Sequence, residues 1–286
     1  HDALPISTQE TLSMPVSQSR LLACILLSTL SAASWADVVI VDTVADENKV
    51  DNSLCSLREA VVYIKAKNAQ VDSTNINIAL INQKISVLLQ TNAENENEIY
   101  AITTKPEAQQ DKARLKVLQD EVTANNTTIK NFKADIQTLE DNLQKFRDTG
   151  IDGCKTHDGA GSDTITLNTP GAYILSSPIT IDSSLNIKSS LTFTEDSTDT
   201  LLNTSSERTL FKPSGVFRLF IIDDGKANYD ADAPTAPDRR INVTFTNIDF
   251  QGCNQNACAT DGGIFYNAET LTIIQSVISG GIASAN

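Results

Sequence analysis

The chain has 286 residues, of which 40% are hydrophobic and 20% are charged, a composition typical of globular proteins. Its 36 acidic and 22 basic side chains give a formal net charge of -14, which is opposite to the charge that a nucleic-acid-binding surface requires. We therefore expect no nucleic-acid partner. The chain has two histidines, one methionine and one tryptophan, so the composition also argues against histidine-dependent catalysis and favours a scaffold or surface protein.

Residues 14–36 have the features of a signal peptide. A basic residue, Arg20, precedes a short apolar run, and small residues follow up to Ala36. The apolar run is too short to span a bilayer as a helix. We expect cleavage before Asp37 and export of the chain to the cell surface or the extracellular space. Residues 1–13 fit no targeting pattern and are interpreted as non-native upstream residues.

Four cysteines remain after removal of the signal peptide. They are Cys55, Cys154, Cys253 and Cys258. An even number in a chain bound for an oxidising compartment predicts two disulfides, and four cysteines allow three pairings. Free thiols, or a zinc site that uses Cys154 and His157, are the alternatives.

Residues 66–150 carry the pattern of a helical hairpin. Within 71–102 and again within 115–146, the seam positions recur at alternating intervals of three and four residues, as in coiled coils. Between these segments a Thr-Thr-Lys-Pro sequence interrupts the pattern, and Pro106 is expected at the first turn of the second helix. Two helices joined by a short loop run antiparallel.

Two registers of the hairpin satisfy the seam. One has a tight turn and brings Cys55 and Cys154 together at the base of the hairpin. The other needs a longer loop and pairs Asn92 with Asn125. We favour the tight turn, because a disulfide could then close the hairpin. In either register Asn92, Asn95 and Asn125 are polar seam residues, which weaken a coiled coil while limiting its sliding.

The segment before the hairpin contains a strand and a helix start. Val38–Val41 reads as a strand, and an acidic, turn-rich loop follows it. In the string Cys-Ser-Leu-Arg-Glu-Ala that begins at Cys55, Ser56 and Glu59 have the spacing of a capping box, which predicts a helix start. Its apolar face would contain Leu57, Ala60, Val61 and Ile64.

This string closely resembles the CSLREA domain, which follows the signal peptide of bacterial exported proteins. The resemblance covers residues 38–61 and resumes at 163–175. It implies that residues 37–65 form a strand-helix cap and that the remainder is a right-handed parallel β-helix. The hairpin would then be an insertion into the short link that joins the two matching segments.

Residues 151–286 independently have a repetitive β pattern. Short alternating apolar segments recur without any helical pattern between them, which leaves a sandwich, a barrel or a β-solenoid. These segments are centred on Ile165 with Leu167, Ile179 with Ile181, Leu185 with Ile187, Leu191 with Phe193, Phe217 with Leu219 and Ile221, Val243 with Phe245, and Leu271 with Ile273.

An internal repeat favours the solenoid. The segment Val243–Gly252 is echoed by Leu271–Gly280, 28 residues later. The predicted fold is therefore mainly β: a right-handed single-stranded parallel β-helix with an N-terminal strand-helix cap and an inserted antiparallel coiled-coil hairpin. Because the last residues stop within a rung, we expect the β-helix to continue beyond Asn286.

The best candidate for chemistry is the acidic loop 223–238. It holds Asp223, Asp224, Asp230, Asp232 and Asp238, with Arg239 and Arg240 directly after it. An Ala-Pro-Thr-Ala-Pro stretch marks it as a surface loop, which is a poor platform for catalysis. Calcium binding fits the clustered oxygen ligands better, although known calcium-loop spacings are missing, and a solvated loop is the simplest interpretation. We assign no catalytic residue and no cofactor.

These observations favour an exported bacterial surface or secreted β-helix protein with a structural or adhesin-like role. A protein or glycan of a host or cell surface would be its kind of partner. The alternative is the N-terminal part of a carbohydrate-active enzyme of the polysaccharide lyase or hydrolase type. A third hypothesis gives the hairpin a role in self-association.

Overall fold

The structure is a computed structural model that describes residues 37–48, 52–158, 162–190, 209–226, 240–252 and 263–280. These residues form a mixed α/β architecture with two long α-helices, one 3-10 helix and thirteen strands. The helices are α2 (Leu57–Thr103), η1 (Glu107–Gln109) and α3 (Lys112–Thr149). The strands are β1 (Asp37–Val41), β2 (Thr156–Asp158), β3 (Thr164–Leu167), β4 (Gly171–Leu175), β5 (Ile179–Ile181), β6 (Leu185–Ser189), β7 (Thr209–Pro213), β8 (Phe220–Ile222), β9 (Asn242–Thr246), β10 (Ile248–Gln251), β11 (Phe265–Asn267), β12 (Thr270–Ile274) and β13 (Ile278–Ser279).

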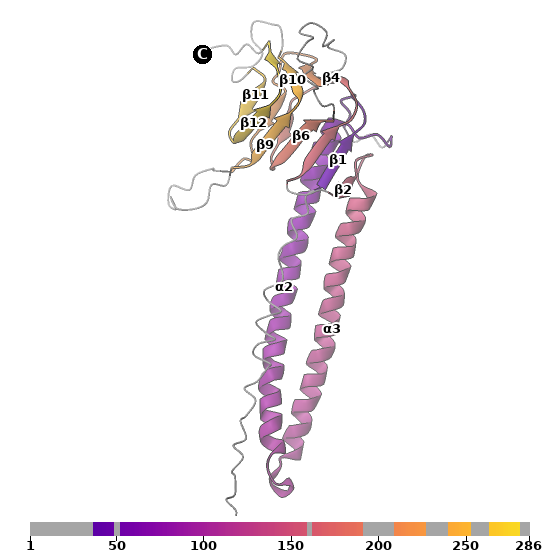
Figure 1. Cartoon of the computed structure of the whole chain (residues 1–286). Helices are drawn as coiled ribbons and strands as arrows, with labels where there is room; N and C mark the ends of the chain where they lie inside the picture. Colours follow the sequence, from indigo (N-terminus) through magenta and orange to yellow (C-terminus); the bar gives the residue numbers. More distant parts are fainter. Residues whose placement is uncertain are drawn as a thin grey trace, which may run out of the picture. The chain divides into compact units, whose positions relative to one another are not determined.

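Strands β3 to β13 are assigned in rotation to three sheets. The sheet orders are β12-β9-β6-β3-β1-β2, β13-β10-β7-β4 and β11-β8-β5. Figure 1 shows β12, β9, β6 and β1 following one another across the first of these sheets. Every pair among these strands is parallel, and only β1 with β2 is antiparallel. The prediction of parallel β structure is therefore confirmed at this level, within a chain that is mixed α/β.

The two copies of the internal repeat lie side by side as the paired strands β9 and β12. In the parallel pair of β9 and β12, Val243 lies opposite Leu271 and Phe245 opposite Ile273. Three further hydrogen bonds join residues that are 28 apart in sequence, including Ile248 N–H to Ser276 Oγ at 3.1 Å. The 28-residue echo is thus the distance along the chain between two paired parallel strands.

The alternation of apolar residues predicts which side chains are buried in most strands, but this prediction is wrong for β8. We expected Phe217, Leu219 and Ile221 to share the buried face, whereas the strand buries Phe220 and Ile222. Leu219 is also buried, ahead of the strand. The failure has a simple cause: residues 219–222 are all apolar, so period two does not decide which side chains point inward.

Alternate strand residues and the start of α2 form one hydrophobic core. The expected face of α2, with Leu57, Ala60, Val61 and Ile64, is buried in the same cluster as Val39 of β1 and Ile165 of β3. Phenylalanines fill the later part of this core, with ring centroids 5.4 Å apart for Phe211 and Phe220, 4.9 Å for Phe220 and Phe245, and 5.3 Å for Phe245 and Phe250. The predicted cap strand and cap helix are therefore both part of the core.

The described residues fall into two compact units. Asn75–Leu139, the larger part of both long helices, form one unit, and 37–74 with 140–280 form the other. Lys67 and Arg147, which the sequence assigned to the hairpin at 66–150, are buried in the second unit. Among the described residues, no helix is both long enough and apolar enough to cross a membrane.

The helices pair in the register that we did not favour. Asn125 Nδ2 donates to Asn92 Oδ1 at 2.9 Å, and Asn92 Nδ2 donates to Asn126 Oδ1 at 2.9 Å. The tight-turn register is therefore wrong at this level of the hairpin. Buried amides are stabilised by pairing with one another, so the seam aligns the asparagines and the connection lengthens.

The connection between the helices also differs from the prediction. Pro106 precedes the 3-10 helix η1, and α3 begins only at Lys112. Asp111 is its N-cap, because its Oδ1 accepts the backbone N–H of Arg114 at 2.9 Å. The prediction that Pro106 stands in the first turn of the second long helix is therefore wrong.

Candidate functional site

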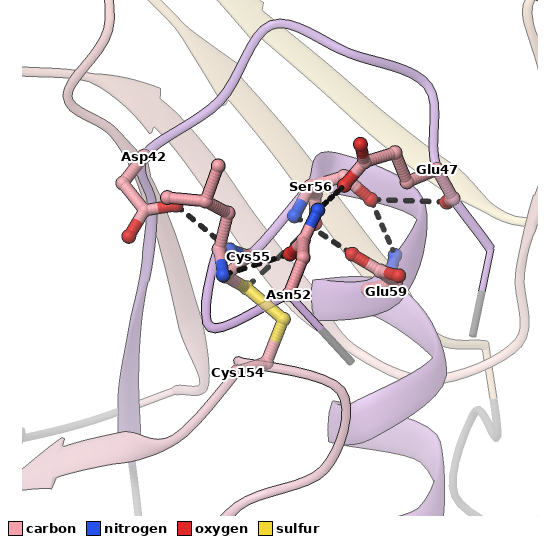
Figure 2. Close-up of a disulfide and its surroundings, with 8 residues drawn as sticks. Asp42, Glu47, Asn52, Cys55, Ser56, Glu59 and Cys154 are labelled. Carbon is pink, nitrogen blue, oxygen red and sulfur yellow. Dashed lines mark hydrogen bonds between the residues drawn. A yellow bond between two sulfur atoms is a disulfide. The ribbon is translucent and has the colours of Figure 1, made fainter. Parts of the chain in front are cut away.

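A disulfide joins Cys55, just before α2, to Cys154, just after α3. The two Cα atoms are 4.7 Å apart, and both residues are 1% exposed. Figure 2 shows the bond against the start of α2. This is one of the pairings that the sequence left open, and it excludes Cys154 as a thiolate ligand of a zinc site with His157.

Two glycines shape the turn that presents Cys154. Gly150 (φ 72°) ends α3, and its N–H donates to Phe146 O at 3.0 Å. Gly153 (φ 80°) follows within the turn, and a Cβ at this position would stand 2.3 Å from Leu54 O. Both positions favour glycine because the left-handed conformation and the close backbone contacts leave no room for a side chain.

The capping box predicted at Ser56 and Glu59 is present in full. Ser56 N–H donates to Glu59 Oε2 at 3.1 Å, and Glu59 N–H donates to Ser56 Oγ at 3.3 Å. Ser56 Oγ also donates to Glu47 O at 3.0 Å (Figure 2). Because Asp42 Oδ1 also accepts Cys55 N–H at 2.7 Å, the preceding loop holds the N-terminal end of the motif.

Arg58 joins the start of α2 to the loop between β4 and β5, which is far away in the sequence. Its guanidinium binds Asp46 through two hydrogen bonds of 2.8 and 2.9 Å, and it donates to the carbonyl oxygens of Ser177 and Pro178. Asp46 Oδ2 in turn accepts the backbone N–H and the hydroxyl of Ser176, both at 2.6 Å. Bidentate pairing of this kind fixes geometry as well as charge.

These contacts control the pKa of Asp46. Burial acts to raise the pKa of this carboxyl, but the hydrogen bonds from Arg58 and Ser176 outweigh burial and hold the pKa below its ordinary value. The neighbouring Tyr173 has no such compensation. Burial, with a smaller contribution from the charge of Asp42, raises the pKa of Tyr173 to about 12.

A second charged group lies deeper, where the first turns of α2 meet the end of α3. Lys67 Nζ lies 2.5 Å from Asp163 Oδ1 and 3.3 Å from Asp37 Oδ2. Arg147 pairs with both oxygens of Asp37, and Asp37 N–H donates to Asp163 Oδ1 at 3.1 Å. Lys67, Asp37 and Arg147 are at most 4% exposed, and Asp163 is 9% exposed. We call these four residues the buried ion cluster.

A third group is the acidic cluster of Asp223, Asp224 and Glu269. The first two follow β8 and the third follows β11, and each offers a carboxylate oxygen within 4.8 Å of the others. Oxygen ligands in this number suit a hard cation such as Ca²⁺ or Mg²⁺. Among the described residues, this cluster is the place that could hold a metal ion.

Several predicted site residues lie outside the described residues. They are Cys253, Cys258, Asp230, Asp232, Asp238 and Arg239. Of the acidic loop, the structure brings Asp223 and Asp224 together, and it adds Glu269, which the sequence did not single out. The 28-residue repeat gives no signal for Glu269, because this residue precedes the repeated segment and its counterpart 28 residues earlier is Ile241.

The buried ion cluster was also missed. Asp37 and Asp163 are 126 residues apart, and no local pattern links them. In the sequence, Lys67 and Arg147 resemble the other charged residues of the long helices, so nothing indicates that they are buried.

The chain matches no protein-family model, no curated protein and no solved structure at a significant level.

Proposed function

We propose that this chain is an exported bacterial protein with a CSLREA-type cap on a right-handed parallel β-helix. The rotation of successive strands over three parallel sheets supports the β-helix. The 28-residue register between stacked strands supports it further, since a solenoid stacks one turn on the next at such intervals.

The position of the Cys55 segment carries the proposal. Strand β1 pairs in parallel with β3, so it extends the sheet at the side opposite to β12. The start of α2 then buries Leu57 and Ile64 in the core that the strands enclose. An added strand and an amphipathic helix that protect the first turn are what a solenoid cap requires.

The role that we propose for the CSLREA-like string is structural. Its cysteine forms a disulfide, its serine and glutamate cap a helix, and its arginine clamps Asp46. Each of these side chains is thus engaged in folding contacts. We infer a scaffold that displays its surface to a protein or glycan of a host or cell surface, and the disulfide is compatible with an oxidising compartment.

Export is tested by expressing the full chain in a bacterium and determining the first residue of the product outside the cytoplasm. We expect a mature chain that begins at Asp37 and contains an oxidised Cys55–Cys154 pair. Retention of the uncleaved chain in the cytoplasm would contradict the proposal. A variant with Ala36→Trp is the matched control, because a bulky residue at this position should block cleavage without altering the described fold.

The scaffold role is tested separately on the exported chain. We expect retention of the chain on glycans or proteins of a cell surface without any release of reducing sugars or unsaturated products. Turnover of a polysaccharide by the purified chain would contradict the scaffold role and support the enzymatic alternative.

A further inference from the structure

The acidic cluster is produced by the stacking of two strands. Strands β8 and β11 are parallel neighbours, with Ile222 opposite Asn267. The residues that follow them therefore emerge at the same edge, which brings Asp223 and Asp224 beside Glu269. Their carboxylate oxygens lie within 4.8 Å of one another. Like charges this close repel one another unless a cation lies between them.

Glu269 supplies an independent observation. Glu269 is only 7% exposed, and its carboxylate lies beside those of the two aspartates. Glu269 Oε2 accepts the backbone N–H of Ile241 at 3.2 Å, whereas Oε1 is fully buried and none of the described residues donates a hydrogen bond to it. A buried carboxylate oxygen without a donor is costly, and coordination of a cation would offset that cost.

The other two carboxylates are held in place by the backbone. Asp223 Oδ1 accepts Gly225 N–H at 2.7 Å, and Asp224 Oδ1 accepts Lys226 N–H at 2.8 Å. Lys226 Nζ lies 3.5 Å from Asp224 Oδ2. The lysine side chain is 75% exposed, so it can move away when a cation binds.

We propose that Asp223, Asp224 and Glu269 form a calcium site. Three carboxylates supply up to six oxygens, and water completes a shell of six to eight ligands. The flexible geometry that Ca²⁺ accepts suits a site assembled from two adjacent turns, whereas Mg²⁺ demands a strict octahedron. Zinc is disfavoured, because it prefers sulfur and nitrogen ligands and the cluster offers only oxygen. The ion would link two neighbouring turns of the stack.

The test is a calorimetric titration of the full chain with CaCl₂ in 150 mM NaCl, alongside the variants Asp223→Asn and Glu269→Gln. We expect one saturable site with a dissociation constant of about 10⁻⁴ to 10⁻³ M, and a loss of affinity of about tenfold or more in both variants. The glutamine keeps an oxygen that can accept Ile241 N–H, so circular dichroism of the variant should match that of the unaltered chain.

Glu96→Gln is the matched control. It removes the same charge from an exposed position of α2 and should leave calcium affinity unchanged. The proposal fails if there is no saturable site, if Glu96→Gln weakens binding as much as Glu269→Gln does, or if MgCl₂ binds equally tightly. Should Asp223→Asn fail to fold, the comparison of Glu269→Gln with Glu96→Gln decides alone. None of these outcomes depends on export or on the proposed scaffold role.

Discussion

Two lysines on the same helix show how burial decides what a charge contributes. Lys65 is 67% exposed and pairs with Asp182 at 2.5 Å, whereas Lys67 is 1% exposed and lies between Asp37 and Asp163. Exposed pairs contribute little because water screens them. Removal of a buried cation leaves the charge of its buried carboxylate partners uncompensated.

We therefore predict opposite outcomes for two matched substitutions. Lys67→Met should lower the free energy of unfolding by about 3 to 5 kcal/mol, since it leaves Asp37 and Asp163 with one cation fewer. Lys65→Met should change it by less than about 1 kcal/mol. Urea unfolding followed by far-UV circular dichroism measures both free energies. Equal effects of the two substitutions would contradict the assigned role of the buried ion cluster.

Asp46 gives a prediction about pH. Its pKa is lowered in the folded state, so its contribution to stability is present above the ordinary value near 3.8 and disappears as the pH falls through the lower folded value. Asp46→Asn should lower stability at pH 7 and make the decline of stability between about pH 5 and pH 2 less steep. Urea midpoints across this range measure the slope, and parallel curves for both proteins would refute the prediction.

At this scale the sequence predicts local motifs and misses distant ones. Ser56 and Glu59 are three residues apart, so their capping box could be recognised directly. The partners of Lys67 could not be predicted, because Asp163 lies 96 residues away and only the folding of the chain brings it near.

At the scale of elements, the hairpin illustrates what periodicity determines. Seam spacing predicts two helices and their antiparallel pairing, but several registers satisfy the same seam. The hydrogen bonds of Asn92 with Asn125 and Asn126 select one of them. Closure at the disulfide does not require a tight turn, because the segment that connects α2 to α3 is long enough to include the 3-10 helix η1.

The asparagines of the seam give a third prediction. Asn92 is hydrogen-bonded across the helices, whereas Asn95 Nδ2 is buried without an acceptor among the described residues. Asn95→Leu should raise the free energy of unfolding by about 1 to 2 kcal/mol, because an unsatisfied polar group is replaced by an apolar one. Asn92→Leu should lower it, since Asn125 and Asn126 lose their partner. Thermal unfolding at 222 nm compares them, and stabilisation by both would argue against the asparagine-determined register.

At the scale of the whole molecule, one covalent bond closes a very long loop. The disulfide joins positions 99 residues apart, so in the unfolded chain it restricts everything from the start of α2 to the end of α3. The sequence identified the cysteines, but it could not choose their pairing, because the pairing depends on where α2 begins and α3 ends in space.

Replacement of both cysteines by serine should therefore cost about 4.7 kcal/mol of unfolding free energy, on the loop-entropy account. The urea midpoint of the double variant, measured beside that of the oxidised chain, gives the value. A midpoint equal to that of the oxidised chain would show that the bond does not constrain the unfolded state. Mass spectrometry of the non-reduced chain verifies the pairing beforehand.

The contact between Asp37 N–H and Asp163 has a consequence for maturation. If a peptidase cleaves before Asp37, as we propose, this amide nitrogen becomes a terminal ammonium 3.1 Å from Asp163 Oδ1. Proteolysis would then add a cation to a group where Lys67 and Arg147 already balance two carboxylates. Cleavage would therefore leave this buried group with three cations against two carboxylates, so the precursor and its product should differ in stability and unfold at different urea concentrations.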